Sequence, residues 1–93
     1  ERIRSLSETA GVQYHSWSLS SAKGRWGSCS SDRRIRLNWR LMHLKPEIID
    51  YVIAHELAHL SEMNHSPRFW QRVAEIYPGY EVAKKALKGV YIT

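Results

Sequence analysis

The chain has 93 residues, of which 43% are hydrophobic and 25% charged, and its formal net charge is +5. This length fits a single domain, and no apolar run approaches the roughly 18 residues that a membrane-spanning helix needs. The single cysteine, Cys29, excludes an intrachain disulfide, and no secretory signal pattern is present, so we expect a cytoplasmic protein. Because the sequence starts at Glu1 without an initiator Met and within a helical pattern, we expect residues 1–93 to be one domain from the C-terminal part of a longer chain.

The first half of the chain predicts one helix followed by three short strands. The helical pattern of Glu1–Ala10 ends at Gly11, a residue favoured just beyond a helix end. Alternating polar and apolar residues, or clusters of β-forming residues, then mark three strands: Gln13–Leu19, Arg25–Cys29 and Arg34–Asn38. The connections Ser20–Gly24 and Ser30–Arg33 are short, which favours an antiparallel meander, with a mixed sheet as the alternative.

The second half of the chain predicts helices. Their expected ranges are Pro46 to about Met63, Pro67–Tyr77 and Tyr80–Lys88. Pro46 suits a first helical turn, Ser66 suits a helix cap, and the Pro78-Gly79 pair separates the last two helices. Val90–Ile92 is expected to add a strand or an ordered tail. We therefore predict an α+β fold, with a small antiparallel or mixed three-stranded sheet packed on the first of these helices and two further C-terminal helices.

A metal-binding motif lies in the longest predicted helix, where His55, Glu56 and His59 form the pattern H-E-x-x-H. Residues four apart on a helix lie about 40° from each other around the axis and roughly 6 Å along it, so both imidazoles can reach one ion. Glu56 lies one position round, outside the coordination shell, where its carboxylate can take the proton of a metal-bound water. The pattern predicts a zinc site.

His65 is the strongest candidate for a third ligand. In a continuing helix it would lie about 9 Å beyond His59 along the axis, so the helix must end between Ser61 and Asn64 for the chain to turn back. Asn64 tolerates the left-handed conformation that is common at such an end. Three carboxylates are alternative third ligands: Glu62, Glu75 and Glu81. Three protein nitrogens would leave the fourth position open to water, the arrangement of a catalytic rather than a structural zinc.

Beyond the histidine motif, several segments carry a family resemblance: Arg25–Cys29, Ile35–Asn38, Asp50–Ala54, Asn64–Ser66 and Phe69-Trp70. With the motif they resemble the YgjP-like metallopeptidase family and, more loosely, the WLM and SprT-like metallopeptidases. The resemblance covers roughly Tyr14–Tyr77 and implies a zincin fold, one zinc held by the three histidines, and Glu56 as catalytic base. Metzincins share the spacing of the three histidines but have Gly where this chain has Glu62, so the spacing does not indicate that class.

The residues and the resemblance together predict a zinc-dependent metallopeptidase, in which Glu56 acts as general base on a zinc-bound water. Peptides or proteins are the expected substrates. Two alternatives stay open: a metal-dependent nucleotide phosphohydrolase, and a non-enzymatic nucleic-acid-binding domain with a structural zinc. Both alternatives, and nucleic acid as a partner, depend on five arginines before the motif: Arg25, Arg33, Arg34, Arg36 and Arg40.

Other residues have weaker signals. Strand Arg34–Asn38 is the candidate edge strand for pairing with an extended peptide, with an interior strand as the alternative. Four side chains are candidates to stabilise a developing oxyanion: Tyr51, Arg68, Tyr77 and Tyr80. Cys29 is expected to pack in the interior, as are the four tryptophans: Trp17, Trp26, Trp39 and Trp70.

Overall fold

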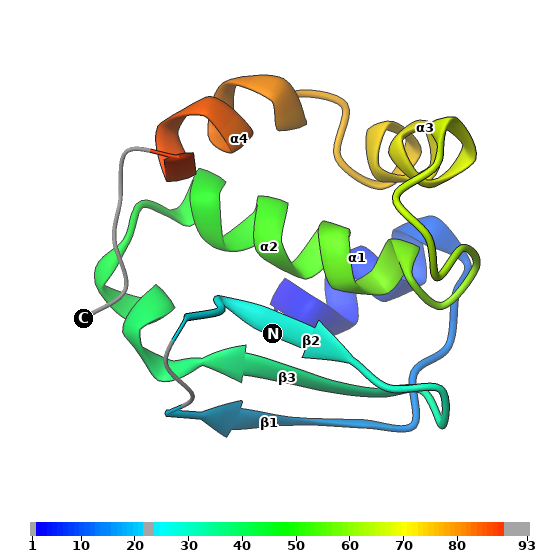
Figure 1. The fold of residues 1–93 in the computed structure, drawn as a ribbon, viewed down its shortest axis with the longest axis horizontal. Coiled ribbons are helices and arrows are strands. Elements are labelled where there is room, and N and C mark those ends of the chain that lie inside the picture. The colour runs from blue at the N-terminus through cyan, green and yellow to red at the C-terminus, as the bar shows by residue number, and fades with distance from the viewer. Residues whose placement is uncertain (1, 22–23, 89–93) are drawn as a thin grey trace.

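The computed structural model describes residues 2–21 and 24–88, and the predicted strand or tail at Val90–Ile92 lies outside them. In chain order the elements are α1 (Arg2–Ala10), β1 (Ser16–Ser20), β2 (Gly27–Cys29), β3 (Arg34–Asn38), the 3-10 helix η1 (Trp39–His43), α2 (Pro46–Ala58), α3 (Pro67–Ile76) and α4 (Tyr80–Lys88). The sheet lies on one side of α2, and α3 and α4 lie on the other (Figure 1). The predicted α+β architecture is confirmed. Along the described residues, none of the helices has the length and apolar character needed to cross a lipid bilayer.

The sheet is mixed, with strand order β1-β3-β2. β2 and β3 form an antiparallel hairpin in which Gly27 is opposite Leu37 and Cys29 opposite Ile35. β1 runs parallel to β3 on its other side, with Trp17 opposite Ile35. The expected antiparallel meander is therefore wrong and the mixed alternative is right. β1 and β2 run in opposite directions but are not neighbours, because β3 lies between them.

This strand order also overturns the expectation that Arg34–Asn38 is an edge strand. β3 is paired on both sides, and its Ile35 and Leu37 are buried. The two edges of the sheet belong to β1 and β2. Of these two strands, β2 is the one that lies against α2, with Gly27 next to the side chain of Glu56.

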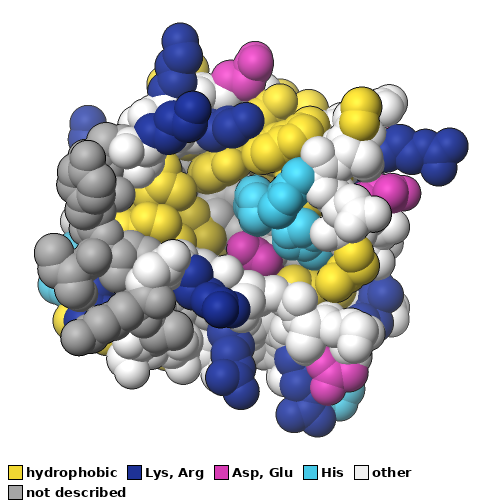
Figure 2. Space-filling model, viewed as in Figure 1, with side chains coloured by type: hydrophobic (Ala, Val, Ile, Leu, Met, Phe, Trp, Pro, Cys, Tyr) yellow, Lys and Arg dark blue, Asp and Glu magenta, His cyan; other side chains and the backbone are white. Residues whose placement is uncertain are grey.

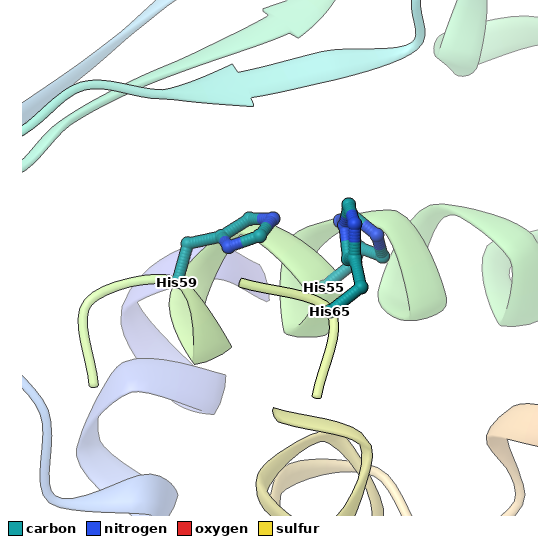
Figure 3. Close-up of side chains that lie close together, drawn as sticks. All are labelled: His55, His59 and His65. Carbon is teal, nitrogen blue, oxygen red and sulfur yellow. The ribbon is translucent and has the colours of Figure 1, made fainter. Parts of the chain in front are cut away.

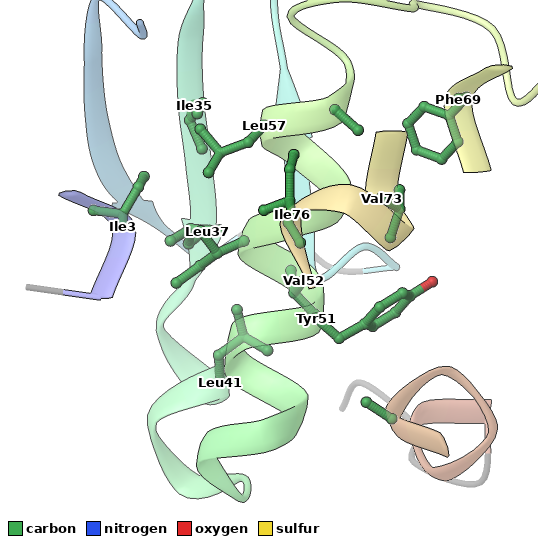
Figure 4. Close-up of a cluster of buried hydrophobic side chains, with 14 residues drawn as sticks. Ile3, Ile35, Leu37, Leu41, Tyr51, Val52, Leu57, Phe69, Val73 and Ile76 are labelled. Atoms are coloured by element: carbon green, nitrogen blue, oxygen red, sulfur yellow. The ribbon is translucent and has the colours of Figure 1, made fainter. Parts of the chain in front are cut away.

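α2 is the central element of the domain. Pro46 occupies its first turn, as predicted, and eight of its side chains are buried: Ile48, Tyr51, Val52, Ile53, Ala54, Glu56, Leu57 and Ala58. A helix with apolar residues around most of its circumference packs against other elements on most of its sides. Its side chains pack with those of β3 and α3, and Ile3 of α1, Leu41 of η1 and Ala83 of α4 belong to the same cluster (Figure 4). The motif therefore lies on the helix that packs against the sheet and against the other helices.

α2 ends earlier than predicted. Its last helical residue is Ala58, His59 is its C-cap, and the next residues form tight turns in which the amide nitrogens of Leu60 and Ser61 bond carbonyls three positions back. The expected range to about Met63 is wrong, because apolar spacing continues through a turn that is no longer α-helical. Asn64 does not adopt the left-handed conformation; among described non-glycine residues, only Arg33 has positive φ.

The remaining predicted elements are close to those observed. α1 ends at Ala10, and the Gly11 that follows has a φ of 71°, the left-handed conformation expected just beyond a helix end. Ser66 caps α3 by accepting a hydrogen bond from the Phe69 amide, and α4 has the predicted bounds. The core prediction is wrong for two tryptophans, since Trp17 on edge strand β1 and Trp39 in η1 are 37% and 40% exposed. Their partly buried counterparts, Trp26 and Trp70, pack against the core as expected.

Candidate metal centre

Three histidines converge at the end of α2. His55 lies in the last turn of the helix, His59 is its C-cap, and His65 lies in the loop that leads to α3. One ligand nitrogen from each ring lies within 4.8 Å of the others. The ring centroids are 5.0 Å apart for His55 and His59, 5.2 Å for His55 and His65, and 4.9 Å for His59 and His65. Figure 3 shows His65 reaching back from the loop to join the two helix residues.

Two of the rings are oriented by neighbouring oxygens. Nδ1 of His59 lies 3.1 Å from the carbonyl oxygen of Glu62, and Nδ1 of His55 lies 3.2 Å from Oε2 of Glu56. Such contacts fix a ring and direct its other nitrogen, Nε2, away from the partner. Burial lowers the pKa of His59 below its usual value, which favours the neutral form that binds metals.

Phe69 supports all three imidazoles. Its side chain is fully buried, and its ring centroid lies 5.0 Å from that of His55, 4.5 Å from His59 and 4.8 Å from His65. Because Ser66 caps α3 through the Phe69 amide, the same first turn that holds Phe69 also fixes the end of the loop carrying His65. In the sequence Phe69 belongs to a segment that carries the family resemblance, but its contact with the histidines is not apparent there.

Glu56 lines a cleft of about 260 Å³ together with His55, the one histidine of the three that borders it. Its residue is only 4% exposed, and the cleft is bounded by α2 and by the edge strand β2. Gly27 of β2 lies against it: a Cβ built there would be 3.1 Å from both Cγ and Oε2 of Glu56. The absence of a side chain at Gly27 therefore makes the room in which the carboxylate sits.

The alternative carboxylate ligands do not join the cluster. In the part of the chain that the structure describes, the three histidines form the one group with the spacing of a metal site. Glu75 accepts a hydrogen bond from Nη1 of Arg72 at 3.0 Å, and Glu81 is exposed on α4. Glu62 contributes its backbone carbonyl to His59.

Of the four oxyanion candidates, Tyr51 lines the cleft together with His55 and Glu56. Burial raises the pKa of Tyr51 to about 12, so its hydroxyl stays protonated and able to donate. Tyr80 stacks on Tyr51 with ring centroids 6.4 Å apart, whereas Arg68 is exposed and does not line the cleft. The fourth candidate, Tyr77, is the C-cap of α3 and does not line the cleft either.

Three of the five arginines are engaged within the domain. Nε of Arg33 donates to the carbonyl of Gln13 at 2.8 Å, Arg34 pairs with Asp32 at 2.9 Å, and the guanidinium of Arg40 lies 4.7 Å from the Trp39 ring centroid. The other two, Arg25 and Arg36, line a small hollow beside Gly27. Binding of nucleic acid through these arginines stays a prediction.

Cys29 packs as expected, partly buried against the core. Burial, reinforced by the nearby charge of Glu56, raises the pKa of its thiol to about 11. A thiol with such a pKa is a poor nucleophile and a poor candidate ligand near neutral pH.

The family resemblance is confirmed by comparison with sequence families. The sequence model described as "YgjP-like, metallopeptidase domain" matches residues 1–89. The chain belongs to the YgjP-like family. The YgjP-like domain is thus a zinc metallopeptidase, a hydrolase whose substrates are peptides or proteins. No curated protein matches it.

Two solved structures share the fold of this YgjP-like domain. The metallopeptidase zymogen abylysin of Pyrococcus abyssi is 28% identical, with a TM-score of 0.77 over 90% of this chain and 83% of that one. The metallopeptidase zymogen jannalysin of Methanocaldococcus jannaschii is 19% identical, with a TM-score of 0.74 over 96% of this chain and 94% of that one. The second likeness bears on the fold alone.

Proposed function

We propose that the YgjP-like domain hydrolyses peptide bonds with one zinc ion held by His55, His59 and His65, and with Glu56 as general base. The observation that carries this proposal is the convergence of three imidazole nitrogens within 4.8 Å beside a buried carboxylate. We further propose that residues 1–93 form a single metallopeptidase catalytic domain.

The donor set fits zinc. Imidazole nitrogens bind Zn²⁺ at about 2.0–2.1 Å, which places the nitrogens of a tetrahedral site roughly 3.4 Å apart. The three ligand nitrogens lie within 4.8 Å of one another, so each pair must approach by roughly 1.4 Å at most to reach this separation. Three nitrogen ligands leave a coordination position for a reactant, which is typical of catalytic sites.

When bound, zinc acts as a Lewis acid that polarises a carbonyl and acidifies water. The residues of the domain handle the proton and the developing charge. Glu56, which lines the cleft, accepts a proton from the attacking water on a carboxylate oxygen and passes it to the leaving amine. Tyr51, protonated and in the same cleft, donates a hydrogen bond to the carbonyl oxygen as it becomes an oxyanion.

β2 is the better candidate for pairing with an extended substrate, in place of β3. Within the described residues, its one sheet partner is β3, so its outer edge has backbone groups that can bond a peptide, and its Gly27 lines the cleft. Gly27 lies on this strand against Glu56, which would bring a paired peptide past the general base.

Replacement of Glu56 by Gln tests the proposal. We expect Glu56→Gln to retain zinc but to lose hydrolysis of casein by about a thousandfold, because an amide cannot accept the proton of the attacking water. Glu75→Gln is the matched control, since this carboxylate is exposed on α3 and pairs with Arg72. A Glu56→Gln protein as active as the control would remove Glu56 from the mechanism.

A further inference from the structure

The catalytic cleft has an apolar wall and a cation at its mouth. Trp26, Tyr51 and Leu87 line it, and all three pack with the core, so they present a fixed apolar surface. Arg25 lines the same cleft and is exposed. Its backbone is held in place, because its carbonyl accepts a hydrogen bond from Nδ2 of the buried Asn38 at 3.2 Å.

Arg25 also borders the small hollow beside Gly27, together with Arg36 and Ser28. Arg36 and Ser28 are opposite each other in the β2–β3 hairpin. Neither Arg25 nor Arg36 has an acidic partner among residues 2–21 and 24–88, whereas Arg34 is neutralised by Asp32. Of these two arginines, Arg25 also lines the cleft, whereas Arg36 lines the neighbouring hollow alone. The strand side of the cleft therefore carries one guanidinium group that is not compensated by an acidic partner among the described residues.

Helix α4, which contributes Leu87 to the cleft, carries basic residues around a neighbouring hollow. Lys84 of α4 lies with Nζ 3.9 Å from the centroid of the Trp70 ring, and Trp70 stacks on Tyr80 at 5.7 Å. Lys84 borders a further hollow of about 200 Å³ with Lys85 and Lys88, where Glu81 is the single acidic residue. Figure 2 shows Lys and Arg side chains on both sides of the hollowed face, with histidine and one acidic side chain between them.

We propose that the cleft selects peptides with an Asp or Glu side chain next to the scissile bond, and that Arg25 is the residue that binds its carboxylate. Arginine and a carboxylate form two parallel hydrogen bonds, and the pair strengthens where a bound peptide excludes water. The neighbouring residue of the peptide packs an apolar side chain against Trp26, Tyr51 and Leu87. Lys84 and its neighbours add long-range attraction for an acidic substrate. This inference rests on the proposed peptidase function.

A peptide accounts for these features better than a nucleic acid does. The guanidinium of Arg25 shares one cleft with Glu56, whose carboxylate would repel a phosphate backbone laid along it. A single carboxylate on a peptide can reach Arg25 at the mouth while the scissile bond lies deeper.

The test uses the zinc-loaded full chain and quenched fluorescent peptides that differ only by Glu, Gln or Lys at one position, scanned through the residues on either side of the cleaved bond. At one such position we expect kcat/KM to be about tenfold higher for the Glu peptide than for the Gln peptide, which is the effect of one charge-assisted hydrogen-bonded pair. The Lys peptide should have a lower kcat/KM than the Gln peptide. Arg25→Gln should abolish this preference, and Arg25→Glu should invert it in favour of Lys. Two variants are used because the inversion cannot be produced by a loss of folding.

Arg4→Gln is the matched control, because Arg4 is exposed on α1 and lines neither hollow. It removes one positive charge and should keep the preference for Glu. Hydrolysis of all three peptides at equal rates would overturn the specificity and leave the proposed function standing, whereas no hydrolysis of any peptide would overturn the proposed function itself. An unchanged preference in the Arg25 variants, with Arg25-dependent binding of a single-stranded oligonucleotide, would assign this residue to nucleic acid instead.

Discussion

The two walls of the cleft contribute to the site in opposite ways. The helix wall, α2 and the loop after it, supplies reactive side chains: His55 and Glu56 line the cleft, and His59 and His65 join His55 in the metal centre. The strand wall, β2, supplies space for the Glu56 carboxylate, since Gly27 has no side chain where Glu56 comes closest. It also supplies an edge of the sheet. The helix wall should therefore determine whether metal binds, and the strand wall how well a bound substrate is turned over.

Two substitutions test the separate roles of the strand wall and the helix wall, and Gly27→Ala is the one with the larger expected effect. The new Cβ would lie 3.1 Å from Glu56 Oε2 and 3.2 Å from the Arg36 carbonyl, so the carboxylate must move by a few tenths of an ångström. Because catalysis is sensitive to displacements of this size, we expect kcat to fall about tenfold with zinc content unchanged. Steady-state hydrolysis and metal analysis of the same sample check both parts.

Gly79→Ala is the control for that variant, because a Cβ at Gly79 would meet nothing within 4 Å and its φ is not in the left-handed region. It should retain full activity. Loss of zinc in Gly27→Ala, or equal kcat in the two alanine variants, would contradict the division of roles between the walls.

Ser66→Ala is the smaller change and acts on the helix wall. It removes the hydroxyl that accepts the Phe69 amide hydrogen bond and so loosens the turn that fixes His65 and Phe69. An N-cap contributes about 1 kcal/mol, so we expect zinc affinity to fall about fivefold while kcat at saturating zinc stays the same. Competition with a zinc chelator measures the affinity.

Ser66→Thr keeps a capping hydroxyl and should restore most of the affinity. The expectation would be wrong if Ser66→Ala lowered kcat at saturating zinc or if the threonine variant were no better than the alanine variant.

The helix wall could be predicted from the sequence because its determinants are local. H-E-x-x-H spacing on an apolar-periodic segment fixes two imidazoles on one side of a helix, and Ser66-Pro67 marks where the next helix starts. The exact end of α2 was missed, since apolar spacing does not distinguish the last α-helical turn from the tight turns after His59.

The strand wall could not be predicted in the same way because its determinants are non-local. The parallel pairing of β1 with β3 joins two segments that are separated in the sequence by β2 and its two connections, and turn lengths alone do not reveal it. The contact between Gly27 and Glu56 depends on an absent side chain and on a residue 29 positions away in the sequence. The exposure of Trp17 has the same origin, since it follows from the place of β1 at the edge of the sheet.

The zinc content of three purified proteins, the wild type, His65→Ala and Glu62→Ala, tests the three-histidine centre most directly. The wild type and Glu62→Ala should each bind about one zinc per chain, because Glu62 acts through its backbone carbonyl and alanine keeps that group. His65→Ala should lose zinc affinity by at least about a hundredfold, since a ligand is removed rather than a supporting contact. Equal zinc content in the two variants would contradict the assignment of His65 as the third ligand.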